Sequence, residues 1–333
     1  MKKYSLITSL LLLILFTACK EGNKKETTIA VSKQEVLVDT TKTYAEISVK
    51  QGGEWVNRVY QGDSTFHNVS ELVVPQEHTD HSFYIRYEGP GWESNKVGYR
   101  LYLDWRNAID VFGKVTDSLI LDRVGQDNFD SYHEMNPWGM DILKVGKGLG
   151  VGSVGRYINK EVLHFNNVDT TSVTVNNDAN ASGITINYTG WETAGDKIDL
   201  TSTLSIQKDS RITSHTIQSS MAIDNICTGI VKHGVEYFSN QTEKNDWGYI
   251  ATYGEQTLVP DNLGMAIFYQ KSTIANITEW EHDHLLLFKP STAPITYYFL
   301  GAWEKELNGI TTKEAFITYL DTTLEELNAK GTL

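Results

Sequence analysis

Hydrophobic and polar residues alternate along most of the chain, in short runs rich in Thr, Val, Ile and Tyr. Clusters of Asn, Asp and Gly separate these runs. Such period-two alternation is typical of antiparallel strands with one buried face, so the pattern predicts an all-β fold. The predicted strands are Phe83–Tyr87, Gly98–Trp105, Ser172–Val175, Ile184–Tyr188, Asp199–Ile206, Ile212–Gln218, Val231–Phe238, Met265–Tyr269, His284–Phe288 and Thr296–Trp303.

One helix is predicted, between Thr311 and Lys330. The stretch Thr311-Thr312-Lys313-Glu314 offers a capping box, apolar residues then recur at helical spacing, and Gly331 supplies an end signal. We expect this C-terminal helix to pack on a sheet.

The glycine-rich stretch Gly146–Gly155 has neither the Gly-Lys-Ser/Thr ending of a phosphate loop nor the spacing of a dinucleotide site. We therefore expect its glycines to serve bends and close backbone approach within a sheet.

The N-terminus has the pattern of a lipoprotein signal. Lys2 and Lys3 precede an apolar run, Leu10–Phe16, that is too short to span a bilayer, and small residues stand just before Cys19. Residues 1–18 are the predicted signal peptide and Cys19 the predicted lipidation site. We therefore expect the protein to be anchored by lipid to a bacterial membrane, the outer one, facing either the periplasm or the cell surface. The alternative is an uncleaved anchor helix.

Residues 19–42 are polar and aperiodic, which suits a flexible tether. The remaining residues, 43–333, show no repeat and no linker, so they predict a single domain. Apart from Cys19 the only cysteine is Cys227, which excludes an internal disulfide. The formal net charge of −13 makes nucleic acid a poor partner.

The predicted strand Tyr99–Arg106 carries the strongest chemical signal. Alternation places Arg100, Tyr102, Asp104 and Arg106 on one face, about 6.6–6.8 Å apart for successive members. Guanidinium groups bind carboxylate or sulfate in bidentate fashion, so this face is a candidate ligand site. The alternative is an Arg–Asp ladder on a solvated surface.

Aromatic residues and histidines near this strand are further candidates. Trp92 stands in a Gly-Pro loop and could stack on a sugar ring or cap a sandwich edge. His133, in Asp130–Asp141 (DSYHEMNPWGMD), could be a catalyst or a corner residue. His233, in a predicted strand, could be a catalyst or a core residue. His282 and His284 have a spacing that metals can use, but no further ligands are evident, and no motif for a cofactor or a serine nucleophile is present.

Three blocks of the sequence resemble a family of polysaccharide-utilisation lipoproteins long catalogued as a domain of unknown function, some of whose members look to be ulvan oligosaccharide dehydratases. The blocks are EGPGWES from Glu88, YRLYLDWRNAIDVFGK from Tyr99 and DSYHEMNPWGMDILKVG from Asp130. The resemblance implies a large antiparallel β-sandwich of the galactose-mutarotase type. It also implies loss of water from a non-reducing-end uronic acid of an acidic, sulfated oligosaccharide, which leaves a 4,5-unsaturated sugar.

That reaction needs an acid, a base and a group that neutralises the substrate carboxylate. Arg100, with Arg106 in reserve, is the predicted carboxylate receptor. His133 and His233 are the predicted acid and base, and Tyr102 could replace either. Trp92, Tyr132 and Trp138 are predicted substrate contacts. No cofactor is expected, and the use of a metal stays open.

Two other functions fit the same residues. One is a mutarotase or epimerase, in which a histidine acid works with a carboxylate base such as Glu236. The other is a glycan-binding lipoprotein without catalysis, in which the aromatic residues and the arginine face bind the sugar and the histidines are structural.

Overall fold

The structure, a computed structural model, describes residues 42–62, 64–126 and 131–333. The predicted signal peptide (1–18), Cys19 and nearly all of the predicted tether (19–42) lie outside these residues. Within them, no helix is both long and apolar enough to cross a membrane.

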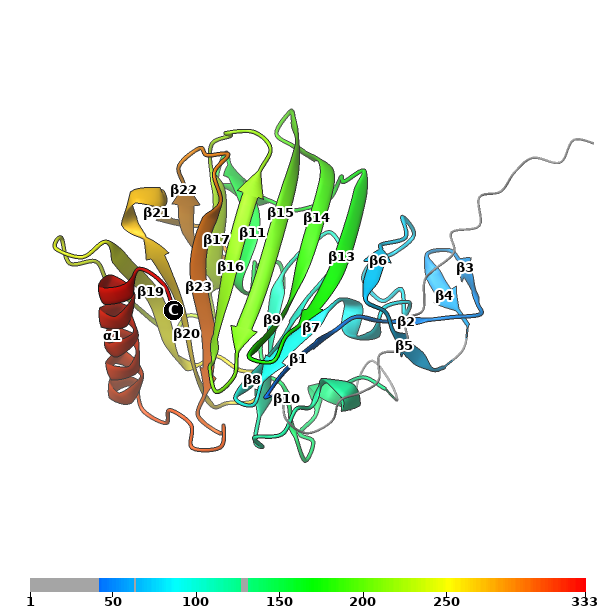
Figure 1. The fold of residues 1–333 in the computed structure, drawn as a ribbon, viewed down its shortest axis with the longest axis horizontal. Coiled ribbons are helices and arrows are strands. Elements are labelled where there is room, and N and C mark those ends of the chain that lie inside the picture. The colour runs from blue at the N-terminus through cyan, green and yellow to red at the C-terminus, as the bar shows by residue number, and fades with distance from the viewer. Residues whose placement is uncertain (1–41, 63, 127–130) are drawn as a thin grey trace, which may run out of the picture. The chain divides into compact units, whose positions relative to one another are not determined.

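The largest element is a nine-stranded sheet in which every neighbouring pair is antiparallel (Figure 1). Its strands, in spatial order, are β18 (Glu236–Asn240), β19 (Trp247–Glu255), β20 (Asn262–Gln270), β23 (Ile295–Trp303), β16 (Ile212–Ser219), β15 (Asp196–Gln207), β14 (Ala181–Thr193), β13 (Thr170–Asn177) and β6 (Glu71–Val73). Buried and exposed residues alternate along β15, as the sequence pattern predicts for a strand with one face on the core.

Two five-stranded sheets pack on one face of this sheet. The first contains, in spatial order, β1 (Thr43–Glu46), β7 (Gly91–Ser94), β8 (Val97–Leu101), β9 (Ile109–Lys114) and β10 (Gly139–Asp141). The second contains β12 (Glu161–Leu163), β11 (Val151–Ile158), β17 (Ile226–Val231), β22 (Asp283–Phe288) and β21 (Ile274–Glu279). Two small two-stranded sheets pair β2 (Ser48–Lys50) with β5 (Phe66–Asn68) and β3 (Glu54–Val56) with β4 (Val59–Gln61). The described residues also form four single-turn 3₁₀ helices: η1 (Arg86–Glu88), η2 (Leu121–Arg123), η3 (Ser131–His133) and η4 (Lys271–Thr273).

The main core lies between the nine-stranded sheet and the two smaller ones. Hydrogen bonds of buried side chains also cross this core. The Tyr99 hydroxyl donates to the carbonyl of Arg211 at 2.7 Å and accepts from the amide of Gly301 at 2.9 Å, which joins β8 to β23. This arrangement confirms the predicted all-β class and the large antiparallel β-sandwich.

The C-terminal helix α1 (Lys313–Lys330) covers the opposite face of the nine-stranded sheet, beside β19 and β20 (Figure 1). The predicted helix is confirmed, but its cap is shifted by one residue. The hydroxyl of Thr312, not Thr311, accepts the hydrogen bond, from the amide of Ala315, so the predicted box with Glu314 does not form. Gly331 ends the helix in the left-handed conformation, with φ of 79°.

Two of the predicted strands are wrong because the backbone turns inside them. In Phe83–Tyr87, both end residues have positive φ, 59° and 41°. In Val231–Phe238, β17 ends at Val231 and β18 begins at Glu236, with Gly234 at φ of 72° between them. Alternation of side chains alone does not reveal a reversal of this kind.

The glycine-rich stretch behaves as predicted. Gly152 in β11 has φ of 78°, and a β-carbon there would lie only 2.3 Å from the ring of Phe299. Glycine therefore lets β11 approach β23 closely.

The contact of α1 with the sheet gives a stability prediction. Leu320 is fully buried, and we expect Leu320→Ala to lower the free energy of unfolding by about 2–5 kcal/mol, because it leaves a cavity. Thr318, exposed on the same helix, is the control, and Thr318→Ala should change it by less than about 0.5 kcal/mol. Urea denaturation measures both; equal values would show that α1 adds little to the folded domain.

Candidate active site

Arg100, on β8, lies at the centre of a buried network on the face of its sheet that points away from the main core. Its guanidinium pairs with Asp110 on β9, at 2.8 Å from Nη2 to Oδ2, and with Asp141 on β10, at 2.6 Å from Nη2 to Oδ2. It also donates to the hydroxyls of Tyr102, at 2.8 Å, and Tyr132, at 2.9 Å. All donors that a substrate carboxylate would use are therefore engaged.

The predicted role of Arg100 as the receptor of the substrate carboxylate is wrong in this structure. The residue is only 1% exposed, because η1, η2 and the segment from Ser131 to Trp138 cover the outer face of its sheet. The alternative, a ladder on a solvated surface, is wrong for the same reason. Arg100 instead neutralises two carboxylates that would otherwise be buried as unpaired charges.

Tyr102 is locked into the same network. Its hydroxyl donates to Oδ2 of Asp110 at 2.6 Å, and its ring lies between two guanidinium groups, 4.6 Å from that of Arg100 and 4.1 Å from that of Arg106. Burial, partly offset by the charge of Arg100, raises the pKa of the phenol well above its usual value. A phenol in these surroundings holds its neighbours in position and does not suit proton transfer to a substrate.

The predicted strand Tyr99–Arg106 is only half correct. β8 ends at Leu101, and the chain turns through Asn107 with φ of 47°. Arg100, Tyr102 and Arg106 nevertheless gather on one side, because Tyr102 stacks between the two arginines.

His133, in η3, joins this network from its solvent side. Its Nε2 lies 3.3 Å from Oδ2 of Asp141, and its ring is 4.5 Å from that of Tyr132. The side chain is 34% exposed, whereas that of Asp141 is 2% exposed. The structure therefore brings His133 together with Arg100, Tyr102 and Tyr132, with the histidine as the member that reaches solvent.

A second group of ionisable residues lies on the other side of Tyr102. The Nη2 atom of Arg106 lies 3.0 Å from Oδ1 of Asp80 and 3.4 Å from Oε2 of Glu88, and Arg106 also pairs closely with Asp104. Nδ1 of His81 is 2.8 Å from Oδ1 of Asp80. Arg106 retains some exposure, 17% for its side chain, but three carboxylates already neutralise its charge.

The two carboxyl groups of this second cluster have pKa values that move in opposite directions. Burial, together with the hydrogen bond to Asp80, raises the pKa of Glu88 to about 7. Burial acts the same way on Asp80, but its hydrogen bond with Glu88 and the charge of Arg106 outweigh it and lower the pKa of Asp80 below its usual value. A neutral acid beside an ionised carboxylate is an arrangement suited to acid–base catalysis.

Backbone conformation around this cluster is unusual. His81, Phe83, Tyr87 and Glu88, all within eight residues, have positive φ values of 57°, 59°, 41° and 67°. Left-handed conformations in residues with side chains cost free energy and concentrate at functional sites. The strain supports the assignment of this region as the functional site.

Asp80, His81 and Glu88 are also the set of described residues that comes nearest to a metal site, with ligand atoms within 4.8 Å of one another. A cation bound there would compete with the guanidinium of Arg106, which already lies against oxygens of both carboxylates. This donor set therefore suits proton transfer better than metal binding.

The two predicted tryptophan platforms are wrong because both rings are inside the protein. Trp92 is 0% exposed, lies in β7 rather than in a loop, and donates from Nε1 to Thr213 at 3.0 Å. Trp138 is 7% exposed and packs edge-on against Phe112. Tyr132, 1% exposed, is likewise not open to a sugar ring, and its hydroxyl serves Arg100.

His233 does not lie in a strand. It follows β17 in the connection to β18. Burial lowers the pKa of its imidazole, and the imidazole is hydrogen-bonded to the backbone of Lys144. None of the contacts described for the Arg100 network or the Asp80–Glu88 pair involves His233. The structure thus describes no contact that joins His233 to the partners of His133.

A pocket of about 280 Å³ opens beside the second cluster. Its wall includes Thr79, which precedes Asp80, and Asp104, the partner of Arg106. Its other lining residues are Arg58, Val74, Pro75, Gln76, His78, Leu103, Trp105, Phe165, Asn166, Val168, Thr171 and Tyr188.

Several residues of the site escape prediction from sequence. Asp80 and His81 lie in an irregular segment, and Glu88 attracts attention only as part of a turn. Arg58 belongs to a hairpin far from the arginine-rich stretch. Positive φ at residues other than glycine would mark this region, but it is visible only in the folded backbone.

The chain belongs to the family described as "Domain of unknown function (DUF4861)", whose sequence model matches residues 11–332. This confirms the predicted membership of a family catalogued as a domain of unknown function. A comparison with curated proteins finds no match.

Among solved structures, the chain is similar to the α-N-acetylgalactosaminidase NagBb from Bifidobacterium bifidum. Its complex with GalNAc is 10% identical, over 69% of this chain and 38% of that chain, with a TM-score of 0.31. Its complex with Gal-NHAc-DNJ gives the same identity and coverage, with a TM-score of 0.34. A TPR-domain containing protein from Parabacteroides distasonis ATCC 8503 is 8% identical, over 79% of this chain and 56% of that chain, with a TM-score of 0.38. The chain thus spans from 38% to 56% of the length of these solved structures.

The buried network gives a second stability prediction. Arg100→Ala leaves Asp110 and Asp141 without their cation, so we expect it to lower the free energy of unfolding by about 3–5 kcal/mol. Arg123, whose side chain is 53% exposed, is the control; Arg123→Ala should change it by less than about 1 kcal/mol. A small effect of Arg100→Ala in urea denaturation would contradict a structural role for this residue.

The raised pKa of Glu88 gives a prediction of pH dependence. Its value in the folded protein, about 7, exceeds the ordinary 4.5, so between these values the folded protein holds more protons than the unfolded chain. The free energy of unfolding should therefore fall as pH rises through this window. Glu88→Gln should flatten the fall without abolishing it. Burial also raises the pKa of Asp110, with the help of Asp141, to about 6 and that of Asp283 to about 7, and both keep contributing to the slope. Denaturation curves at several pH values measure this; an unchanged slope would mean that Glu88 has an ordinary pKa.

Proposed function

We propose that this protein is a carbohydrate-active carbon–oxygen lyase, a dehydratase that removes water from the non-reducing-end uronic acid of an acidic oligosaccharide. The observation that carries the proposal is the Asp80–Glu88 pair, with its divergent pKa values, beside Arg106, whose partner Asp104 lines an open pocket. The resemblance of three sequence blocks to a family with ulvan oligosaccharide dehydratases supplies the reaction.

In this reaction a base takes the proton from C5 of the uronate. The C4–O4 bond then breaks with its electron pair leaving on oxygen, a proton is added to that oxygen to release water, and a C4–C5 double bond forms. The acid must carry a proton near neutral pH, and the base must be accessible to the sugar.

Glu88 suits the acid, because its pKa of about 7 keeps part of the carboxyl groups protonated at neutral pH. His133 suits the base, since its side chain reaches solvent and Asp141 lies against its Nε2. Asp141 would stabilise the imidazolium that forms when His133 takes the proton, in the manner of other carboxylate–histidine pairs.

Proton abstraction next to a carboxylate builds up negative charge, which is the main part of the barrier. Arg100 and Arg106 are already neutralised by carboxylates, so the uronate needs a different cation. This requirement directs attention to the pocket beside Asp104.

The mutarotase alternative assigns the base to Glu236. In the structure Glu236 lies on β18, 57% exposed, and pairs with Lys313 of α1. It has no described contact with His133, Glu88 or their partners, so the geometry favours Glu88.

The cellular location is part of the proposal. We propose that Cys19 is lipidated and anchors the enzyme to a bacterial membrane, on the strength of the apolar run and the small residues that precede it. The substrate would then be an oligosaccharide met outside the cytoplasm.

The test uses the protein cut after Cys19 with saturated, uronic-acid-terminated oligosaccharides. Loss of one water with a rise in ultraviolet absorbance is the expected result, with kcat falling as pH rises above about 7 because Glu88 loses its proton. Glu88→Gln and His133→Ala should each lower kcat by roughly 10²–10⁴-fold.

Glu236→Gln is the matched control, because it makes the same chemical change at an exposed carboxyl group. It should keep the wild-type kcat. A product of unchanged mass but altered anomeric or epimeric ratio, lost in Glu236→Gln, would establish the mutarotase instead. Binding without any product would leave only a glycan-binding protein.

A further inference from the structure

Arg58 differs from the other arginines of the chain. Six of the seven arginines pair with a carboxylate: Arg86, Arg100, Arg106, Arg123, Arg156 and Arg211. Arg58 makes no ion pair with any described residue. In a chain with a net charge of −13, an arginine without a carboxylate partner is an available receptor for an anion.

The surroundings of Arg58 hold its guanidinium in place. The residue lies in the turn between β3 and β4, with φ of 66°. Its Nε donates to the carbonyl of Glu77 at 3.2 Å, and its Nη2 donates to the carbonyl of His78 at 3.0 Å. These bonds use part of the donor set, and among the described residues no acceptor engages Nη1. A fixed guanidinium with a donor to spare loses little entropy on binding a ligand.

Arg58 lines the pocket of about 280 Å³. That volume lies at the lower end of ligand pockets, roughly 300–1,000 Å³, so it suits one sugar ring. The rim carries groups that recognise sugars: the amides of Gln76 and Asn166 and the indole of Trp105, which is 40% exposed. An exposed indole offers an apolar face, and the amides bind hydroxyl groups.

The other ionisable groups of the pocket do not oppose an anion. Asp104 lines it, but its carboxylate is turned to Arg106, accepting from the backbone amide at 2.8 Å and from Nε at 2.9 Å. Burial lowers the pKa of His78 to about 4, which keeps its imidazole neutral. Arg58 is therefore the permanent cation that this pocket presents.

We propose that this pocket is a subsite for one sugar ring with an anionic substituent, a carboxylate or a sulfate ester, and that Arg58 selects charged over neutral sugars. The inference rests on the proposed function for its meaning, since the pocket adjoins the Asp80–Glu88 pair through Asp104 and Arg106. It assigns to Arg58 the role of specificity residue that the sequence assigned to Arg100.

The test is calorimetry on the protein cut after Cys19, with three probes: methyl β-D-glucuronoside, methyl β-D-glucoside 6-sulfate and methyl β-D-glucoside. We expect wild type to bind one or both charged sugars more tightly than the neutral one. Arg58→Gln should lower the affinity for a charged sugar by about 10-fold to 100-fold, as for loss of hydrogen bonds to a charged group, and that for the neutral sugar by less than about 2-fold. The charged probe that binds more tightly identifies the anionic group.

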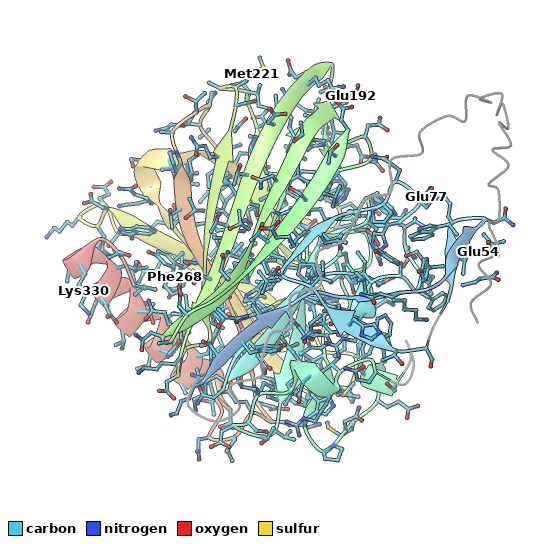
Figure 2. The ribbon with its side chains drawn as sticks, turned by 45° about the vertical axis from the view of Figure 1, so that its right-hand side comes forward. Glu54, Glu77, Glu192, Met221, Phe268 and Lys330 are labelled. Carbon is cyan, nitrogen blue, oxygen red and sulfur yellow. The ribbon has the colours of Figure 1, made fainter. Side chains whose placement is uncertain are left out.

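Three further variants test whether a damaged loop explains the result. Arg58→Lys keeps the charge and should keep part of the preference. Trp105→Ala should weaken all three sugars alike. Lys330→Gln is the control, because it removes a positive charge far from the pocket. Figure 2 shows Lys330, on α1, well away from Glu77, whose carbonyl accepts a hydrogen bond from Arg58. This variant should bind all three sugars as wild type does.

The proposal is overturned if wild type shows no preference for a charged sugar, or if folded Arg58→Gln keeps that preference. Its failure is separable from that of the dehydratase. If Arg58→Gln removes water from the oligosaccharide as fast as wild type, the subsite is wrong but the dehydratase stands. If the preference for charged sugars depends on Arg58 but no water is lost, the dehydratase is wrong but the subsite stands.

Discussion

Arg100 and its two carboxylates are the interaction on which the outer face of the β1–β10 sheet depends. Asp110 and Asp141 come from β9 and β10, and Arg100 from β8, so one guanidinium joins three adjacent strands. Removing any of these charges from water is costly unless the others are present. The loops that cover this sheet, with Tyr132 and His133, take their positions from the same cluster, since Tyr132 binds Arg100 and His133 lies against Asp141.

This constraint divides the arginines by task. A guanidinium that neutralises buried carboxylates cannot also bind a substrate, because its donors and its charge are already used. Arg100 and Arg106 therefore organise the site, and the only arginine left without a carboxylate among the described residues, Arg58, is the one that faces the pocket. Arg100 was predicted as the anion receptor because it is close in sequence to the other candidate site residues. Arg58 suits that role better, because its charge is not paired with any described carboxylate.

Proton chemistry follows from the same packing. Glu88 is covered by its own strained turn and has Asp80 as a neighbour, so burial and hydrogen bonding keep its proton near neutral pH. Asp80, more exposed and next to Arg106, stays ionised. One segment, from Asp80 to Glu88, thus supplies two carboxyl groups of different character, while His133 lies against Asp141 in the neighbouring network of Arg100.

The sequence by itself determined the all-β class, the helix α1 and the glycines of β11, because alternation, helical spacing and glycine act over a few residues. It also determined membership of the family and the grouping of Arg100, Tyr102 and His133 in one region. Only the tertiary structure decided that Trp92 and Trp138 are buried, that Glu88 has a raised pKa, and that Arg58 has no carboxylate partner among the described residues. Burial and charge pairing depend on partners distant in sequence, such as Asp141 for Arg100. A local sequence pattern therefore does not show which side chains are already paired in the folded protein.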